Sequence, residues 1–423
     1  MKKVVGIIAE FNPLHNGHAK LINKAKEITG AEYCVVIMSG NYVQRGEPAL
    51  FHKDLRVRAA LTAGADAVFE LPVPFATGSA EFFAGAAVSM LCRLGCVTDL
   101  VFGSEIGDVN LLRSISSLLN KETEEFKNAL KEGLASGLNF PSARAKALSI
   151  IPELADQGGS TDKVLSGSNN ILGIEYLRAI EKNGNIITPH TILRKGSYHA
   201  DGTGELSSED PSAESLRALL VMNAKGSALS AAVRDSIPAE LADLYETAVK
   251  SGQFITSDHF SPLLLQALNY ETTESLTAYR DLTGDLANRI LDLADRHVVF
   301  SDLISSCKTK NLTYTRISRA LLSLILHITK EETEERKSRG YADCAYLLGF
   351  RKQSGELLTL IKKESSIPVV TNVGDAARSL NDIQLPDFHR DLRRDALYEK
   401  LTAGIHRKDP EKTVYERQIV ILP

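Results

Sequence analysis

The sequence predicts an α/β protein in which a Rossmann-like parallel-sheet domain is followed by a mainly helical C-terminal domain. Over about the first 200 residues, short runs rich in Val, Ile and Phe alternate with helical stretches, and helical periodicity dominates afterwards. With 423 residues, of which 43% are hydrophobic, the chain is long enough for two or three domains with substantial cores. We place the first domain at residues 1–225 and the second at residues 226–423.

The strands of the first domain are predicted from continuous apolar runs, which are typical of strands buried on both faces of a parallel sheet. These runs are Val4–Glu10, Tyr33–Met38, Asp66–Leu71 and Asp99–Gly103, with a fifth strand at Asn185–Thr188. The helices between them are predicted at Ala19–Ile28, Lys53–Ala63, Ala80–Leu94 and Asn169–Lys182. Because the connections are short, we expect right-handed crossovers that cover both faces of the sheet.

The second domain is predicted from helical spacing of its apolar residues. The clearest helix is Arg316–Ile328, whose apolar side chains form one stripe. Further helices are expected at Ser212–Met222, Ala239–Lys250, Pro262–Tyr270 and Asp285–Asp295, and short strands at Ile367–Thr371 and Val414–Leu422.

Composition excludes several classes of protein. Five cysteines are an odd and sparse set, which favours reduced thiols in a cytoplasmic protein over a disulfide scaffold. The longest apolar run is far shorter than the ~20 residues of a membrane helix, so no membrane partner is expected. The composition alone does not identify metal ligands.

The strongest functional signal is the turn after the first strand, Glu10-Phe11-Asn12-Pro13-Leu14-His15-Asn16-Gly17-His18. A helix follows, and the free N–H groups and positive dipole end of a helix bind phosphate. His15 and His18, three residues apart in the first turn, are expected on one face beside those donors. Gly17 leaves room for a ring or ribose to approach the backbone. The turn therefore predicts a cradle for a triphosphate.

The alternatives for two histidines at this spacing are a structural pair or a metal site. A metalloprotease is disfavoured because H-E-x-x-H is absent. Walker A and G-x-G-x-x-G motifs are absent too, so the histidine turn is the phosphate site that the N-terminal sequence offers.

Polar residues after the second and fourth strands mark the edge where parallel sheets bind ligands. Ser39, Gln44 and Arg45 follow the second strand and would contact acetate or phosphate; a solvated loop is the alternative for the arginine. Gly103 ends the fourth strand, where it offers an uncrowded backbone for adenine or ribose or simply forms a turn.

A third group lies at the start of a helix. Ser168 is a plausible cap, and Asn169 and Asn170 fall in the first turn. Capping explains one or two of these residues and leaves an asparagine side chain to bind nucleotide.

The charge distribution is uneven. Residues 301–423 hold 21 basic and 17 acidic side chains, a net charge of +4, against −8 for the first 300 residues. Basic residues at the start of the predicted helix Arg316–Ile328 would bind RNA phosphates. The alternative interpretation is that they form an ordinary solvated surface. They are Lys308, Lys310, Arg316 and Arg319.

Several segments, in order, resemble the tRNA(Met) cytidine acetate ligase family of the HIGH-motif nucleotidyltransferase superfamily. They are V-G-I-I-A-E-F-N-P-L-H-N-G-H, V-I-M-S-G-N-Y-V-Q-R-G-E-P-A, F-E-L-P, F-G-S-E, S-N-N-I-L-G-I-E-Y-L and T-I-L-R, with Y-L-L-G-F in the second half. The resemblance implies a ligase that makes acetyl-adenylate from acetate and ATP. It then transfers acetyl to the 4-amino group of the wobble cytidine of elongator tRNA(Met), giving N4-acetylcytidine.

The resemblance also implies roles for residues. His15, His18 and Arg194 would stabilise the transition state, and Lys195 and Ser197 would replace the mobile Lys-Ser loop of class I synthetases. The residues themselves, rather than the resemblance, make the nearby Asp201 and Glu205 candidates to hold Mg²⁺ through water, and ordinary solvated loop carboxylates are the alternative. ATP would be bound by Gly6, Ile7, Ile8, Ala9, Glu10, Phe11, Asn12, Pro13, Leu14, His15, Asn16, Gly17, His18, Gly103, Arg194 and either Asn169 or Asn170.

Two rival functions fit parts of the sequence. A small-molecule nucleotidyltransferase, which transfers adenylyl to a phosphorylated cofactor precursor, needs the first domain alone and leaves the basic helical half unexplained. A non-catalytic RNA-binding protein with a relict nucleotide fold needs neither histidine.

Overall fold

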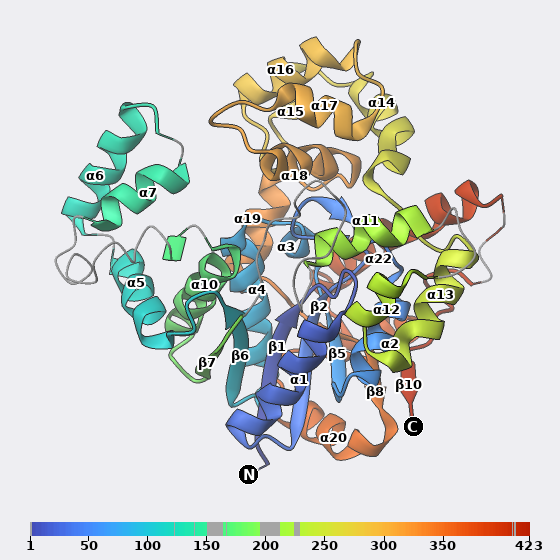
Figure 1. The fold of residues 1–423 in the computed structure, drawn as a ribbon. Helices are drawn as coiled ribbons and strands as arrows, with labels where there is room; N and C mark the ends of the chain where they lie inside the picture. Colours follow the sequence, from blue (N-terminus) through green and yellow to red (C-terminus); the bar gives the residue numbers. More distant parts are fainter. Residues whose placement is uncertain are drawn as a thin grey trace.

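The computed structural model describes residues 2–121, 123–138, 140–149, 164–165, 167–194, 212–223, 229–407, 409 and 412–423 (Figure 1). Its centre is an eight-stranded sheet with the order β10-β8-β5-β2-β1-β6-β7, and β9 pairs with β8. The strands are β1 Val4–Ala9, β2 Tyr33–Ser39, β5 Ala67–Leu71, β6 Asp99–Ser104, β7 Thr188–Leu193, β8 Ala345–Arg351, β9 Val369–Val370 and β10 Val420–Leu422.

The sheet changes direction of progression beside β1. From β1 the chain moves through β2 to β5, then crosses back to place β6 on the other side of β1, and β7 follows at that edge. These neighbours are parallel, with Val4 opposite Tyr33 and Val5 opposite Asp99. The loops that leave β1 and β6 therefore diverge at the carboxyl edge, which is where open α/β sheets bind ligands.

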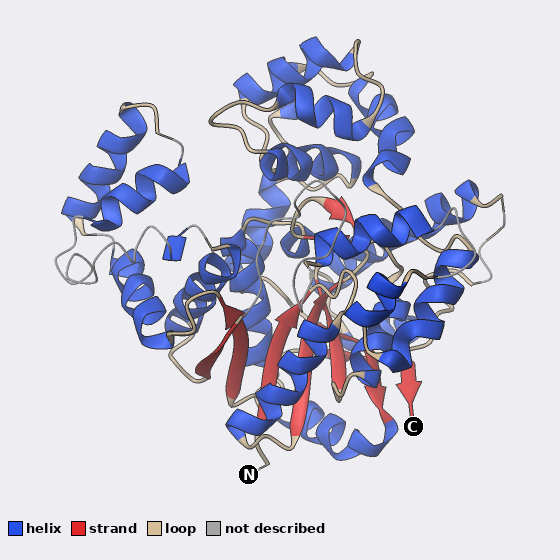
Figure 2. Ribbon diagram, in the orientation of Figure 1, coloured by secondary structure: helices blue, strands red, loops and turns tan. Residues whose placement is uncertain are grey.

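Helices cover both faces of the sheet (Figures 1 and 2). Alternate side chains of β1 enter two cores: Val5 and Ile7 pack towards α1 Asn16–Thr29 and α2 Lys53–Thr62, and Val4 packs towards α4 Ala80–Arg93. The remaining sheet-covering helices are α3 Val73–Ala76, α5 Val109–Lys121, α10 Ser168–Lys182, α11 Ala213–Asn223, α12 Ala231–Ser236, α13 Ala242–Lys250, α20 Gly355–Glu364 and α22 Gln384–Ile405.

A helical lobe stands over the carboxyl edge, at the top of Figure 1. Its helices are α14 Ser261–Leu268, α15 Thr273–Leu276, α16 Gly284–Ala294, α17 Phe300–Cys307 and α18 Tyr314–Ile325, followed by α19 Lys330–Ser338. The predicted stripe of α18 is confirmed, since Ile317, Leu321 and Leu324 are fully buried in the lobe's core. Tyr42 of the short strand β3 (Tyr42–Val43) also enters that core, so the lobe packs on the loop after β2.

Smaller elements complete the chain. The strand pair β3 Tyr42–Val43 and β4 Glu47–Pro48 forms a hairpin after β2. The others are α6 Glu124–Ala135, α7 Phe140–Ser149, α21 Ala376–Ser379 and the 3-10 turns η1 Ala239–Leu241, η2 Ser257–Phe260, η3 Lys352–Ser354 and η4 Val373–Asp375. Among the helices described, none is long and apolar enough to cross a membrane. All five cysteines are free.

The α/β fold with a helical C-terminal part is confirmed, and three details differ from prediction. The fifth strand is Thr188–Leu193 rather than Asn185–Thr188, because Asn185 has a positive φ of 56° and its N–H bonds back to Ile180, which ends α10. The first helix begins at Asn16, three residues before its predicted start. The second predicted C-terminal strand is reduced to Val420–Leu422.

The sheet also crosses the predicted boundary between residues 225 and 226. β8 lies antiparallel to β5, with Val68 opposite Gly349, and β10 pairs with β8. The place of β8 beside β5 is determined by the packing of this apolar segment against β5. The helical periodicity of the surrounding sequence does not indicate that the segment joins the sheet. As a division between folding units, the boundary stays a prediction.

A candidate nucleotide site at the carboxyl edge

The turn after β1 is organised by its two histidines. His15 is the cap of α1, with an extended backbone, and its Nδ1 accepts the N–H of Gly17 at 3.1 Å. His18 completes the reciprocal arrangement, because its Nδ1 accepts the N–H of His15 at 3.4 Å. The two rings lie with their centroids 3.9 Å apart. The predicted juxtaposition of the histidines is confirmed, although His15 precedes the first turn of the helix.

These backbone contacts fix the tautomer of both rings. An Nδ1 that accepts a backbone N–H carries no proton, so each neutral imidazole has its proton on Nε2. Burial holds the pKa of His18 well below its ordinary value, and the neighbouring His15 and Arg194 lower it further. His18 is therefore neutral at pH 7 and offers an N–H donor without a charge.

A buried arginine braces the backbone beneath this turn. Arg56 of α2 is fully buried, and its guanidinium donates to the carbonyl of Glu10 at 2.7 Å and of Ser39 at 3.0 Å. It also donates to the carbonyl of Gly40. Arg56 thus ties the carboxyl ends of β1 and β2 together. Sequence reasoning missed it, since an arginine inside a helix has no pattern that distinguishes it from a surface one.

The second half of the chain anchors the same turn. Tyr245 of α13 donates its hydroxyl to the carbonyl of Leu14 at 3.0 Å, and Arg217 of α11 donates to the carbonyl of Asn12 at 2.9 Å. Asn16 donates to the carbonyl of Asp235 at 2.8 Å. These long-range contacts fix the path of the chain from β1 into α1.

A second group lies where β6 and β7 end. Arg194 follows β7, and its N–H bonds to the carbonyl of Ser104 at 2.9 Å. Its side chain runs over Gly103, where a Cβ would lie 2.9 Å from the arginine Cδ. Its Nη1 donates to Oδ1 of Asn169 at 3.1 Å. Gly103 therefore makes room for Arg194, a role that the sequence did not predict.

The two asparagines at the start of α10 have different surroundings. Asn170 is 1% exposed, and its Oδ1 accepts the backbone N–H groups of Glu105 at 3.0 Å and Ile106 at 3.3 Å. The side chain of Asn169 faces Arg194 instead. The predicted cap Ser168 is the first residue of the helix, and Gly167 precedes it as the cap position.

The residues after β2 are only partly brought to the histidine turn. The backbone N–H of Gln44 donates to the Glu10 carboxylate at 2.7 Å, which ties the hairpin to the turn. Arg45 instead forms an ion pair with Glu214 of α11 at 2.8 Å. Ser39 is fully buried, and its hydroxyl has no hydrogen-bond partner in the part of the chain described.

The basic residues predicted to bind RNA lie on the helical lobe. Lys308 and Lys310 are exposed in the segment between α17 and α18, and Arg316 is half-buried in the first turn of α18. Arg319 differs, because its Nε donates to Asp281 at 3.1 Å. The lobe packs on the hairpin through Gly46, whose φ is 79°. A Cβ at this position would lie 2.3 Å from the backbone nitrogen of Arg319.

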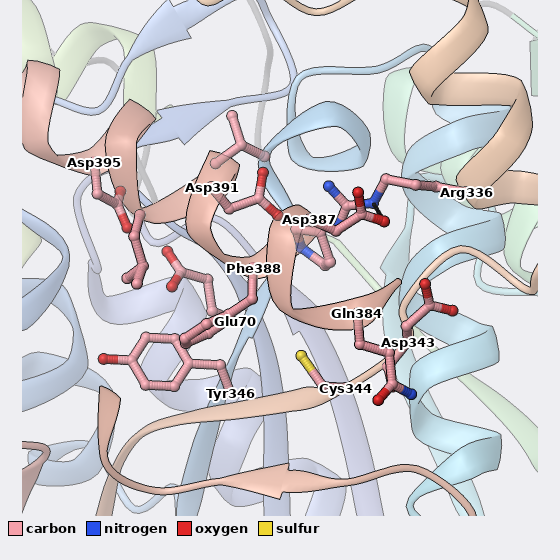
Figure 3. A pocket seen from close by; sticks show the side chains of 13 residues that line it. Glu70, Arg336, Asp343, Cys344, Tyr346, Gln384, Asp387, Phe388, Asp391 and Asp395 are labelled. Carbon is pink, nitrogen blue, oxygen red and sulfur yellow. Dashed lines mark hydrogen bonds and ion pairs between the residues drawn. The ribbon is translucent and has the colours of Figure 1, made fainter. Parts of the chain in front are cut away.

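A separate small cavity lies between β5, β8 and α22 (Figure 3). Glu70, Tyr346 and Asp395 line it, and Lys53 binds Glu70 at 2.8 Å and also pairs with Asp395. Burial and the neighbouring Asp395 raise the pKa of Glu70 to about 8. The cavity measures about 30 Å³, which is room for a water molecule and not for a nucleotide.

The model of one family matches nearly the whole chain. It describes the HIGH nucleotidyl transferases and covers residues 1–412. Together with the paired histidines at the end of β1, it defines the chain as a member of the HIGH nucleotidyltransferase family.

Comparison with individual proteins narrows this assignment. The chain is 35% identical over 384 residues to the tRNA(Met) cytidine acetate ligase of Acetivibrio thermocellus, covering 90% of this chain and 91% of that protein. It is 38% identical over 391 residues to the ligase of Caldanaerobacter subterraneus subsp. tengcongensis, covering 92% and 93%. The crystal structure of Thermotoga maritima TmcAL bound with alpha-thio ATP matches with a TM-score of 0.88 at 30% identity over 99% of both chains. The chain belongs to the tRNA(Met) cytidine acetate ligase family.

Proposed function

We propose that this protein activates acetate with ATP and transfers the acetyl group to the 4-amino group of the wobble cytidine of elongator tRNA(Met), forming N4-acetylcytidine. The observation that supports this most is the pair of neutral imidazoles at the start of α1, with the charge of Arg194 close enough to lower the pKa of His18. The proposed substrates are those of the tRNA(Met) cytidine acetate ligases to which the chain is 35% and 38% identical.

In the first step an acetate oxygen attacks the α-phosphorus of ATP. A bond from this oxygen to phosphorus forms, the bond to pyrophosphate breaks, and acetyl-adenylate results. His15, His18 and Arg194 stabilise the charge that develops on the phosphoryl oxygens, and no covalent bond to the protein is needed. Braced by Arg56 and Tyr245, the turn presents its donors with little reorganisation.

In the second step the cytidine amine attacks the acyl carbon of acetyl-adenylate. A carbon–nitrogen bond forms, the bond to AMP breaks, and the amine loses a proton. The mixed anhydride is already activated, so the contribution of the protein is to position the tRNA.

Asn169 and Gly103 complete the proposed ATP site. Asn169, rather than Asn170, would contact the nucleotide, because the Asn170 side chain is buried against the backbone of Glu105 and Ile106. The nearby backbone of Gly6 to Leu14 would line the same site. Among acetate contacts, we place Ser39 and Gln44 ahead of Arg45, which pairs with Glu214.

Mg²⁺ is expected with ATP, since the ion commonly binds to phosphate oxygens and water. Within the described residues, no three His, Cys, Asp or Glu side chains are grouped to hold a metal. The side chains proposed from the sequence for phosphate or Mg²⁺, Lys195, Ser197, Asp201 and Glu205, lie outside the described residues. A cytoplasmic location also stays a prediction.

The exposed lysines of the lobe are proposed to bind tRNA phosphates. Lys308→Ala with Lys310→Ala should weaken tRNA binding and lower its salt dependence by about one unit of slope for each phosphate that is no longer neutralised. Arg319→Ala is the comparison, because its charge is already paired with Asp281. An equal decrease of tRNA affinity in the double lysine variant and in Arg319→Ala would indicate that tRNA binds to another surface.

The decisive experiment supplies labelled acetate, ATP and total tRNA, and locates the label after nuclease digestion. We expect it in N4-acetylcytidine, and ATP–pyrophosphate exchange should require acetate. Exchange that depends on a phosphorylated cofactor precursor instead would identify a small-molecule nucleotidyltransferase. Transfer of label to another nucleoside would contradict the proposed acceptor.

A further inference from the structure

The start of α10 is occupied by a carboxylate from outside the helix. Glu105, just after β6, accepts the backbone N–H of Asn169 at 3.0 Å through Oε1 and the backbone N–H of Asn170 at 2.8 Å through Oε2. The side chain of Asn170 in turn accepts the backbone N–H of Glu105. The glycine at position 167 leaves space for this carboxylate, since a Cβ there would lie 2.6 Å from Oε2 of Glu105 and would displace it.

Glu105 makes one contact that helix capping does not need. Its Oε1 also accepts the side-chain Nδ2 of Asn169 at 2.8 Å. A serine or aspartate at the cap position would satisfy the same backbone N–H groups without reaching that amide. Burial raises the pKa of Glu105, but the hydrogen bonds from Asn169 outweigh it and leave the pKa below its usual value, so the group is ionised at pH 7.

The extra contact determines which end of the Asn169 amide faces Arg194. With Nδ2 on the carboxylate, Oδ1 points the other way and accepts Nη1 of Arg194 at 3.1 Å. Arg194 in turn lies across Gly103, and its charge lowers the pKa of His18. A continuous series of contacts therefore runs from Glu105 through Asn169 to a guanidinium whose charge acts on His18.

We propose that Glu105 is a positioning residue for ATP: through Asn169 it holds the Arg194 guanidinium in the orientation that binds the triphosphate. This inference rests on the proposed function only in taking ATP as the ligand. We assign Glu105 no direct contact with the triphosphate, because its carboxylate is ionised and already accepts three N–H donors.

The test is a double-mutant cycle on the binding of a nonhydrolysable ATP analogue, with Glu105→Gln and Asn169→Ala singly and together. Glu105→Gln replaces one acceptor oxygen by an NH₂ group that repels a backbone N–H. We expect it to weaken binding about tenfold in the otherwise native protein and less than twofold in the Asn169→Ala background. Equal losses in the two backgrounds would reduce Glu105 to a helix cap and overturn the proposal.

Two further variants keep the test decisive. Asp108→Asn is the matched control, because Asp108 caps α5 three residues later, accepting the N–H groups of Asn110 and Leu111; it should leave ATP affinity unchanged. If Glu105→Gln does not fold, Glu105→Asp keeps the charge but withdraws it from Asn169, and the same loss of coupling is expected. Native affinity with Glu105→Asp would contradict the proposal.

The measurement separates this inference from the proposed function, since analogue binding needs neither acetate nor tRNA. Coupled losses of ATP affinity in a protein that forms no N4-acetylcytidine would reject the ligase and retain the role of Glu105. Formation of N4-acetylcytidine together with uncoupled losses of ATP affinity would retain the ligase and reject the role of Glu105.

Discussion

Two helices, α1 and α10, begin at the same edge of the same sheet, but the acceptors of their first backbone N–H groups differ in charge. In α1 the free N–H groups of Gly17 and His15 are accepted by neutral imidazole nitrogens. In α10 the N–H groups of the second and third helical residues, Asn169 and Asn170, are accepted by the Glu105 carboxylate. Both helices have the same positive dipole end. Among the residues described, the first turn of α1 holds no acidic side chain, whereas the start of α10 is opposed by the Glu105 carboxylate.

This contrast shows that a helix N-terminus becomes an anion site through what fills its first turn. Neutral caps in α1 satisfy backbone N–H groups without placing a negative charge against the helix dipole, which suits the binding of an incoming phosphate. The carboxylate at α10 occupies the equivalent position, so that turn serves to position Asn169 and Arg194 instead.

Removing an imidazole from the α1 turn is expected to have the largest effect. His15→Ala and His18→Ala should each lower acetyl-adenylate formation by ~10²–10³, because each deletes a donor aimed at charge that develops in the transition state. Acetate-dependent ATP–pyrophosphate exchange measures this loss, and tRNA affinity should be nearly unchanged.

His297→Ala, in the helical lobe, is the matched control for a histidine removed elsewhere. If both turn variants kept native exchange and native tRNA acetylation, α1 would not be the phosphate site. A non-catalytic RNA-binding protein would then be the better interpretation.

Making α1 resemble α10 is the second way to test the comparison. Asn16→Asp puts a carboxylate in the first turn of α1, and Asn16→Ala removes the same hydrogen bond to Asp235 without adding charge. We expect the aspartate variant to bind ATP about tenfold more weakly than the alanine variant, since like charges repel across the first turn. Titration at low and high salt checks this: the difference should shrink with salt, and equal affinities would count against a phosphate at this helix end.

The sequence was sufficient for the parts of the fold and site that are local. The strands β1, β2, β5 and β6 are continuous apolar runs, and their order with short crossovers leads to a parallel sheet. The two histidines and the pair Asn169 and Asn170 were singled out because each group follows a strand or begins a helix at the ligand-binding edge, and the choice between the two asparagines was left open.

Contacts between distant segments could not be predicted. The segment of β8 has no property that selects an antiparallel place beside β5, and only packing decides it. Asn169 and Asn170 are adjacent and chemically identical, so only the fold shows that Asn170 turns inward to Glu105. Arg56 and Tyr245 bond to backbone carbonyls, which have no sequence signature.

The two helix starts should also lose stability in different ranges of pH. The pKa of His18 is lowered in the fold, so below about pH 6.5 the unfolded chain binds a proton that the native state does not, and stability falls as pH falls. The pKa of Glu105 is lowered too, and its contribution is lost only as pH falls below about 4.5. His18→Gln should remove a slope of up to about 1.4 kcal/mol per pH unit below pH 6.5, and Glu105→Gln should flatten the profile only below 4.5. Denaturant unfolding across pH checks both, and a His18→Gln profile parallel to wild type would contradict a neutral imidazole at His18.

The smallest effect is expected from the contact that ties the α1 turn to the second half of the chain. Tyr245→Phe removes the hydroxyl that donates to the Leu14 carbonyl and leaves a buried acceptor unpaired, while the ring can keep its stacking on Phe51 at 5.4 Å. We expect a decrease of about 1 kcal/mol in unfolding free energy and a few-fold decrease in adenylate formation, because the turn is still braced by Arg56. Tyr270→Phe, on a side chain that is 78% exposed, is the control and should change neither quantity.

The same substitution tests whether the two turns are anchored independently. The α10 turn is fixed by Glu105 and Asn170 from within the first half of the chain, so Tyr245→Phe should leave the coupling between Glu105 and Asn169 intact. If that coupling weakened as much as adenylate formation, the two turns would act as one rigid unit, and the contrast between them would not extend to their anchoring.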